Sequence, residues 1–330
     1  MKSSNDFWKT LKNPFFVLAP MESVTDTVFR RLVKELSNPD VLFTEFVNTD
    51  GLCSRGKDGV IHRLRHEKSE KPIVAQLWGN SPEHYYKVCQ DIKFLKFDGV
   101  DINLGCSVPK VVKNENCGAL INNPSLVKEI VLATKEALRN EIPVSVKTRL
   151  GYRRYETQKW GSFLLSLDLA AITIHGRTVR STYAVPSNWD EIKKFVELKN
   201  EINKDVVIIG NGDVTSYKDG LEKQKYSGVD GIMIGRAAVT NPYIFSDVPK
   251  NYFLNLPIKE KIEILKKHAK MFQDFWQDEK DFRVMKRFYK TYFSGFDGAS
   301  EFRVKSMSVN TYDDFCKFIE EVEKDLELSK

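Results

Sequence analysis

Short apolar runs recur from residue 15 to residue 235, and turn residues bound each of them. The runs are rich in β-branched residues and too short for helices, so each predicts a buried strand. The eight runs are Phe15–Ala19, Val41–Glu45, Ile73–Leu77, Gly99–Asn103, Val144–Thr148, Ala171–His175, Val206–Gly210 and Gly231–Gly235. Between them apolar residues return with a helical period, as over residues 125–138.

Eight strands alternating with helices predict an α/β fold, a (β/α)8 or TIM barrel. A doubly wound open sheet is the alternative, but no GxGxxG motif follows any strand. After Pro249 only helical periodicity remains, with one helix ending near Trp276, a second over 282–292 and a third over 312–326. Gly295 and Gly298 break the second helix. We therefore predict a catalytic barrel over 1–249 and a small helical domain over 250–330.

Composition narrows the class of protein. With 42% hydrophobic and 29% charged residues, the 330-residue chain is typical of a soluble globular protein. The five cysteines show no CxxC pair and no zinc-ligand spacing, which predicts a reduced cytoplasmic protein without a structural metal. Neither a signal peptide nor an apolar run of membrane-spanning length is present in the sequence. The net charge of +6 is mild and says little about partners.

Polar residues gather at the carboxyl ends of the predicted strands, where a barrel of this type carries its chemistry. Every one of the eight strands ends in this way, which packing alone does not explain. The residues concerned are Pro20, Met21, Glu22, Glu45, Asn48, Gln76, Asn103, Cys106, Lys147, Arg149, His175, Arg177, Asn211, Gly212, Asp213, Gly235 and Arg236.

The chemistry of these strand ends predicts a ligand with a phosphate and a polar ring. Glycine-rich turns after the last two strands offer backbone N–H groups to a phosphate, and Arg236 adds a charge-assisted bond. Lys147, His175 and the amide of Gln76 supply hydrogen bonds for a polar ring edge. Flavin mononucleotide (FMN) has both parts.

Seven strings of this chain stand out: LAPMESVTD (18–26), VAQLWG (74–79), DINLGC (101–106), VKTRLG (146–151), ITIHGRT (172–178), IIGNGD (208–213) and IGRAAVTNPYIF (234–245). These strings resemble those of the tRNA-dihydrouridine synthases. They occur in order over nearly the whole barrel. A further string, GFDGASEFR (295–303), is similar to the end of the bacterial B-type branch.

The resemblance implies an activity and a set of roles. Family members bind FMN in the barrel mouth, reduce it with NADPH, and pass hydride to C6 of a uracil in tRNA. A loop cysteine, here Cys106, gives a proton to C5. The implied FMN contacts are Pro20, Met21, Glu22, Gln76, Lys147, Asn211, Gly212, Asp213, Gly235 and Arg236, with His175 close by. Asn103 is the implied contact to the uracil or to the flavin edge, and Arg177 and Lys110 are further candidates for substrate contact.

The acid role has a physical basis. Hydride addition at C6 develops negative charge toward C5 and O4, and an acid above C5 quenches it. An unperturbed thiol, with a pKa of about 8.5, is mostly protonated at neutral pH and serves as that acid. One departure from the family is Ser107, which stands where the family has proline and predicts a different path for the loop.

A basic stripe on the second tail helix is the predicted contact to tRNA phosphates. Arg283, Lys286, Arg287 and Lys290 follow the i, i+3, i+4, i+7 spacing of one helix face. Met285, Phe288 and Tyr292 form the opposite face and are expected to pack inward. No membrane and no obligate protein partner are indicated.

Other functions stay open from the sequence alone. One is an FMN-dependent barrel oxidoreductase that acts on a small pyrimidine-like substrate. Another is a barrel aldolase or lyase with Lys147 as its Schiff-base lysine. A third is an inactive RNA-binding relative. Cys53, Cys89 and Cys316 are expected to be packing residues, and Cys117 shares the loop region of Cys106.

Overall fold

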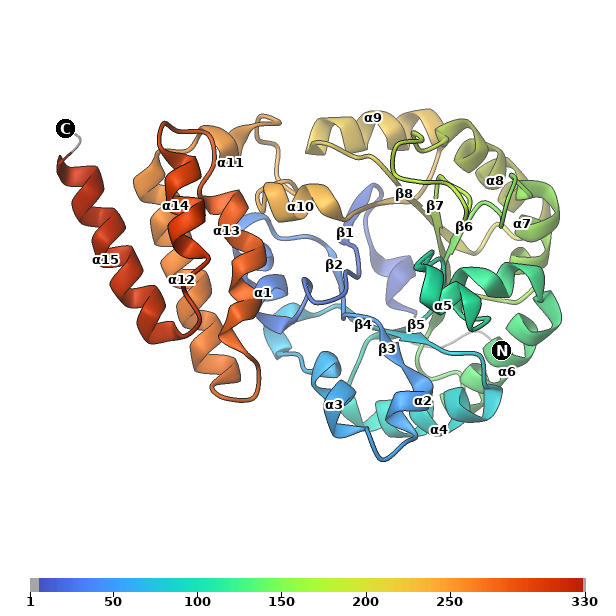
Figure 1. The fold of residues 1–330 in the computed structure, drawn as a ribbon. Coiled ribbons are helices and arrows are strands. Elements are labelled where there is room, and N and C mark those ends of the chain that lie inside the picture. The colour runs from blue at the N-terminus through green and yellow to red at the C-terminus, as the bar shows by residue number, and fades with distance from the viewer. Residues whose placement is uncertain (1–5, 329–330) are drawn as a thin grey trace. The chain divides into compact units, whose positions relative to one another are not determined.

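The computed structural model describes residues 6–328, whose contacts divide them into two compact units (Figure 1). The first unit holds residues 39–235 with the described residues before position 28. The second joins residues 28–38 to the described residues from 236 onward. In residues 6–328, no helix has both the length and the apolar character needed to cross a membrane.

The first unit is a closed barrel of eight parallel strands, which confirms the predicted TIM barrel. Its strands are β1 (Phe15–Leu18), β2 (Val41–Phe43), β4 (Ile73–Trp78), β5 (Gly99–Leu104), β6 (Val144–Arg149), β7 (Ala171–His175), β8 (Val207–Asn211) and β9 (Gly231–Ile234). Each pairs with its neighbours in this order, and β9 pairs with β1 to close the ring. The two-residue strand β3 (Val47–Asn48) pairs with the end of β4. All eight predicted strands are therefore confirmed.

Helices follow the strands and begin at recognisable caps. The longer ones are α4 (Pro82–Ile92), α6 (Pro124–Ala137), α7 (Thr157–Leu165), α8 (Trp189–Ile202) and α9 (Tyr217–Ser227). Four of them begin after a Ser or Asn whose side chain accepts a backbone N–H of the first turn, namely Ser81, Asn123, Asn188 and Ser216. The unit also contains short helical pieces: α2 (Thr49–Leu52), α3 (Asp58–Ile61), α5 (Pro109–Lys113), and the 3₁₀ turns η1 (Phe7–Thr10), η2 (His62–Leu64), η3 (Lys68–Glu70), η4 (Lys93–Leu95) and η5 (Cys117–Asn122).

Apolar side chains fill the amino end of the barrel interior. Trp8 of η1 is buried there, with its ring centroid 6.1 Å from that of Phe15 and 6.3 Å from that of Phe43. Val207 and Ile209 belong to the same cluster and lie two residues apart on β8. Because side chains two apart share a face of a strand, the next inward position on β8 is Asn211. The interior therefore changes from apolar to polar toward the carboxyl ends.

The second unit is helical. It contains α1 (Thr27–Ser37), α10 (Arg236–Thr240), α11 (Tyr252–Asn255), α12 (Ile258–Trp276), η6 (Phe282–Met285), α13 (Lys286–Tyr292), α14 (Ala299–Ser306) and α15 (Tyr312–Leu328). The first and third predicted tail helices are confirmed as α12 and α15, and the second begins as the 3₁₀ turn η6 and continues as α13. Helix α14 was missed, because Gly298 does not only end a helix: with φ +80° it caps the start of the next one.

Helix α1 lies among the tail helices of this unit. Its Phe29 ring stacks on Phe288 at 5.1 Å between centroids, and Glu35 forms an ion pair with Lys267. Ser37 Oγ donates to the carbonyl of Pro242 at 2.6 Å. The assignment of catalysis to residues 1–249 and of a separate helical domain to residues 250–330 stays a prediction.

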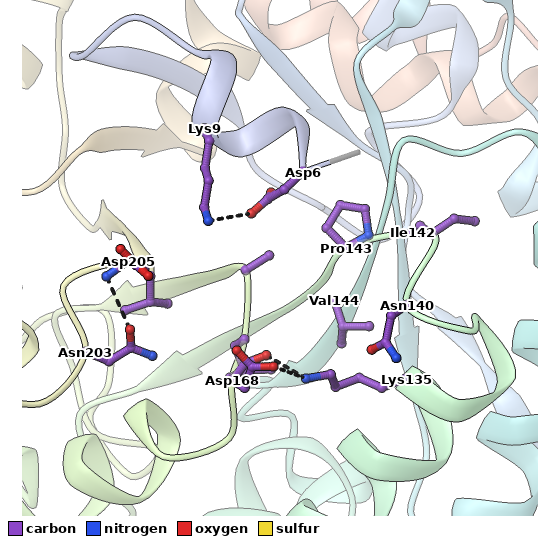
Figure 2. A pocket seen from close by; sticks show the side chains of 13 residues that line it. Asp6, Lys9, Lys135, Asn140, Ile142, Pro143, Val144, Asp168, Asn203 and Asp205 are labelled. Atoms are coloured by element: carbon purple, nitrogen blue, oxygen red, sulfur yellow. Dashed lines mark hydrogen bonds and ion pairs between the residues drawn. The ribbon is translucent and has the colours of Figure 1, made fainter. Parts of the chain in front are cut away.

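A small hollow of about 40 Å³ lies at the amino ends of β6, β7 and β8 (Figure 2). Four of the charged side chains that line it form ion pairs. Lys135 Nζ is 2.8 Å from Asp168 Oδ2, and Lys9 Nζ is 3.9 Å from Asp6 Oδ2. A hollow of this size holds a water molecule or two rather than a substrate.

Candidate active site

Three predicted site residues meet across neighbouring strands at the carboxyl end of the barrel. Lys147 on β6, His175 on β7 and Asn211 on β8 are all partly exposed. His175 pairs in register with Asn211, and Lys147 Nζ donates to Asn211 Oδ1 at 3.2 Å. Asn211 Nδ2 in turn donates to the carbonyl of Met233 at 2.8 Å. The side chains therefore form one connected polar surface around the barrel mouth.

Burial changes the acid–base behaviour of Lys147. Loss of hydration disfavours the ammonium, and the nearby Arg149 guanidinium adds repulsion, so the pKa of Lys147 falls to about 8. Asp101 acts in the opposite direction. Lys147 is thus still mostly a cation at neutral pH, and it presents a positive hydrogen-bond donor to the mouth.

Beneath this surface lies a buried amide–carboxyl network. Gln76 Nε2 donates to Asp101 Oδ2 at 2.8 Å, and Gln76 Oε1 accepts from Asn103 Nδ2 at 3.0 Å. Ser145 Oγ donates to the other oxygen of Asp101 at 2.7 Å. Burial raises the pKa of Asp101 to about 6, against the effect of these donors. The side chain of Gln76 is wholly buried and engaged at both ends, so it supports the site from below.

Asn103 holds the loop that carries Cys106. Its Oδ1 accepts hydrogen bonds from the backbone N–H of Gly105 at 3.0 Å and of Cys106 at 3.1 Å. Arg149 also stabilises this loop through two hydrogen bonds. Its Nε donates to the Gly105 carbonyl at 2.7 Å, and its Nη2 donates to Ser107 Oγ at 3.2 Å. Ser107 therefore takes part in fixing the loop through a hydroxyl that proline lacks.

The Cys106 thiol departs from the expected unperturbed state. A hydrogen bond from the Cys117 thiol, one from the Val108 backbone and the charge of Arg149 outweigh burial and the charge of Glu22. Together they lower the pKa of Cys106 to about 6. Cys106 therefore gives up its proton more readily than an isolated thiol does. Sequence reasoning treated the thiol in isolation and so missed these partners.

Arg177 is buried in an ion pair. Its side chain is 2% exposed, and its Nη2 lies 2.7 Å from Asp213 Oδ2. Its Nη1 donates to Ser187 Oγ and to His175 Nε2, both at 2.9 Å. Because a guanidinium only donates, His175 Nε2 must accept this bond. Arg177 thus orients His175 and Asp213 and does not itself open to the mouth.

The two glycine turns differ in how closely they are packed. Gly212 has φ +132°, and a Cβ there would collide with the side chain of Ser187, so only glycine fits. A Cβ at Gly235 would reach no closer than 3.5 Å to Ala19. Arg236, the next residue, is exposed. Gly235 itself is partly exposed.

The loop after β1 brings the remaining predicted residues. Pro20 and Met21 are partly exposed, and Glu22 pairs with Arg63 at 2.6 Å. The buried Glu45 accepts the backbone N–H of Ser23 and ties this loop to the end of β2. Glu45 was visible as a strand-end carboxylate, but nothing in the sequence indicated its partner.

The predicted basic stripe is exposed at three of its four positions. Arg283, Arg287 and Lys290 are exposed, whereas Lys286 is partly buried and donates to the Met307 carbonyl and to Asn310 Oδ1. Arg283 also forms an ion pair with Asp281. The opposite face packs inward as expected, with Met285, Phe288 and Tyr292 buried.

Sequence comparison finds similar proteins along nearly the whole chain. A family model described as "Dihydrouridine synthase (Dus)" matches residues 17–327. The chain is 39% identical over 324 residues to the probable tRNA-dihydrouridine synthase 2 of Bacillus subtilis (strain 168), covering 97% of this chain and 98% of the relative. It is 38% identical over 327 residues to the probable tRNA-dihydrouridine synthase of Staphylococcus aureus (strain MRSA252), covering 98% and 97%.

Solved structures share the fold at low identity. Histamine dehydrogenase from Rhizobium sp. 4-9 superposes with a TM-score of 0.54 at 13% identity, over 78% of this chain and 48% of that one. The 6-hydroxypseudooxynicotine amine oxidase of Pseudomonas geniculata N1 gives a TM-score of 0.52 at 12% identity, over 70% and 46%. This chain spans about half the length of each, so the likeness concerns the barrel architecture.

Proposed function

This chain belongs to the dihydrouridine synthase family, whose members are oxidoreductases acting on tRNA uridine, and we propose that it reduces the C5=C6 bond of a specific uridine in tRNA. FMN is the bound cofactor of the proposal and NADPH its reductant. The observation that carries the proposal is the Cys106 loop, which Asn103 and Arg149 hold at the barrel mouth beside Lys147.

The partly exposed mouth suits a flavin. Lys147, His175 and Asn211 offer a cation, a ring nitrogen and an amide to its polar ring, while the backbone at Gly235 and the side chain of Arg236 suit its phosphate. Pro20 and Met21 would line one wall. Gln76, Asp213 and Gly212 would support the FMN-binding residues from below, through the contacts described above. When bound, FMN supplies the hydride for C6.

Cys106 is the proton donor of the proposal. The C4 carbonyl polarises the uracil double bond, so negative charge develops toward C5 as C6 is reduced. The Cys106 S–H bond breaks, the new C5–H bond forms, and the electron pair stays on sulfur. The Val108 backbone N–H and the Arg149 guanidinium already stabilise that thiolate. A pKa near 6 lies within about one unit of neutral pH, as suits an acid catalyst.

The tail unit supplies the proposed contact to tRNA, and residues 250–330 are its recognition domain. A base within folded tRNA must leave its stack to enter a barrel mouth, so the backbone has to be held meanwhile. Arg283, Arg287 and Lys290 expose positive charge for this purpose. The reduced cytoplasm is the proposed location, since free thiols persist there.

Charge reversal tests the RNA contact. Arg287→Glu combined with Lys290→Glu should weaken tRNA binding about tenfold or more, because phosphate contacts dominate such affinities. Lys317→Glu with Lys324→Glu is the matched control, since both lysines are exposed on α15 and the charge change is equal. Binding is measured by filter retention at fixed salt, with the flavin spectrum checking the fold. Equal affinity of the two double variants would remove the stripe from the proposal.

The activity is tested on tRNA itself. The purified protein, NADPH and unmodified tRNA should yield a uridine that has gained two hydrogens, located by mass spectrometry of nuclease fragments. tRNA from cells that lack the gene should lose that gain at the same position. Reduction of free uracil or uridine in place of tRNA would favour the small-molecule oxidoreductase instead. A colourless protein that is trapped on a carbonyl substrate by borohydride would favour the aldolase alternative.

A further inference from the structure

A second thiol lies against Cys106. Cys117 begins the turn η5 and is wholly buried, and its thiol hydrogen-bonds to the Cys106 thiol. The two loops also meet through their backbones, because the N–H of Gly118 donates to the Cys106 carbonyl at 3.2 Å. The pair therefore rests on two separate contacts between the segments.

The backbone around Cys117 is shaped for this approach. Cys117 has φ +52°, in the left-handed region that side chains other than Gly, Asn and Asp seldom occupy. At the next residue, a Cβ on Gly118 would lie 2.8 Å from the Cys106 carbonyl oxygen, so only glycine allows the loops to meet. The thiol at position 117 is thus held in place by an uncommon conformation.

The environments of Cys106 and Cys117 determine which of the two thiols donates the hydrogen bond. Burial in apolar surroundings raises the pKa of Cys117 well above its ordinary value, so Cys117 keeps its proton. The charged and titratable groups that face Cys106 are Arg149 and Lys147 of β6 and Glu22 of the loop after β1. Tyr85 of α4 faces Cys117. Cys117 is therefore the hydrogen-bond donor and the Cys106 sulfur is the acceptor.

We propose that Cys117 is a positioning residue, whose S–H stabilises the thiolate that forms on Cys106 when Cys106 gives its proton to the substrate carbon. The inference rests on the proposed function. In this step the Cys106 S–H bond breaks and a C–H bond forms, while Cys117 keeps its own proton. Water later returns a proton to Cys106.

Alkylation of Cys106 measures the effect directly in the flavin-loaded protein. The rate of iodoacetamide labelling is followed against pH, and trypsin separates the two cysteines because Lys110 and Lys113 lie between them. The wild-type midpoint should lie at about 6. Cys117→Ala should raise it by about one to two pH units, the usual effect of losing one hydrogen bond to a charged group.

Three further variants make the test specific. Cys117→Gly removes the thiol while suiting the left-handed backbone, so it covers the case in which Cys117→Ala does not fold. Cys117→Ser keeps a donor and should restore a low midpoint. Cys89→Ala removes another wholly buried thiol, on α4, and should leave the midpoint unchanged.

The rate of tRNA reduction gives a second readout. If Cys106 must be protonated to act, kcat/KM falls as pH rises through the Cys106 midpoint, and Cys117→Gly should move that fall upward by the same amount as the alkylation midpoint. An unchanged alkylation midpoint in folded Cys117→Gly would overturn the inference while tRNA reduction stands. A shifted midpoint in a protein that does not reduce tRNA would instead overturn the proposed function.

Discussion

The two ends of the same barrel strands use polar side chains in different ways. At the carboxyl end, side chains from different strands bond to one another, as Lys147 does to Asn211 and Gln76 to Asp101. At the amino end, charged side chains of helices and loops form ion pairs, as Lys135 of α6 does with Asp168 (Figure 2). The first arrangement leaves partly exposed groups around a mouth, and the second leaves only a hollow of water size.

One type of hydrogen bond recurs at the amino ends of the strands. Asp40, Asp98 and Asp230 each stand just before a strand and accept a backbone N–H from the neighbouring strand. The donors are the N–H groups of Phe16, Ile73 and Ile208, at 2.7, 2.8 and 2.8 Å. These carboxylates satisfy backbone groups and join strands, so the amino end serves stability. The difference teaches that polar strand ends serve two purposes: side chains of different strands bond to one another at the carboxyl end, whereas carboxylates join strands through the backbone at the amino end.

The largest expected effect concerns the carboxyl end. Cys106→Ala should lower the rate of dihydrouridine formation by at least about a hundredfold, because it removes the proton donor. FMN content and NADPH oxidation should stay as in the wild type. Single-turnover reduction of tRNA by the pre-reduced protein measures the effect. Full activity in this variant would show that Cys106 is not the proton donor. The proposed function of the barrel mouth would then fail as well.

The buried ion pair at the carboxyl end gives the next effect. Arg177→Gln should lower the free energy of unfolding by about 3 kcal/mol, since Asp213 and His175 lose their shared donor. Urea titration measures it.

The stability that the Arg177–Asp213 ion pair contributes depends on pH. The pKa of Asp213 is held below its ordinary value, opposed by burial but favoured by hydrogen bonds from Ser187 and Arg177. A carboxyl with a lowered folded pKa contributes stability above its unfolded pKa and loses it as pH falls through the folded value. The gap between wild type and Arg177→Gln should therefore narrow below about pH 4. A constant gap would show that the charge of Asp213 is not involved.

The smallest expected effect lies at the amino end. Asp98→Ala should lower the free energy of unfolding by about 1–2 kcal/mol, because the Ile73 N–H loses its acceptor. The rate of tRNA reduction should not change. Lys71→Met is the matched control: it removes only the exposed partner of Asp98 and should cost less than about 1 kcal/mol. Loss of activity in folded Asp98→Ala would contradict the separation between the two ends.

The amino-acid sequence alone determined the strands, the barrel and the identity of the strand-end residues. Apolar runs such as Val206–Gly210 carry their own signal, because burial selects β-branched residues and the period of two sets the inward face. The same alternation places Asn211 and His175 toward the mouth. Helix α14 was not predicted, because a glycine in the sequence does not show whether it ends one helix or begins the next.

Only the tertiary structure decided the state of each group. Lys147 and Asn211 are 64 positions apart and meet because β6 and β8 flank the same strand, β7, in the barrel. The left-handed turn at Cys117 brings a second thiol to Cys106, and nothing in the local sequence predicts that contact. Protonation depends on burial and on charges from distant segments, so the Cys106 thiol that looked like an ordinary acid has a pKa near 6. Residue types follow from the chain, whereas their acid strength follows from the neighbours that folding supplies.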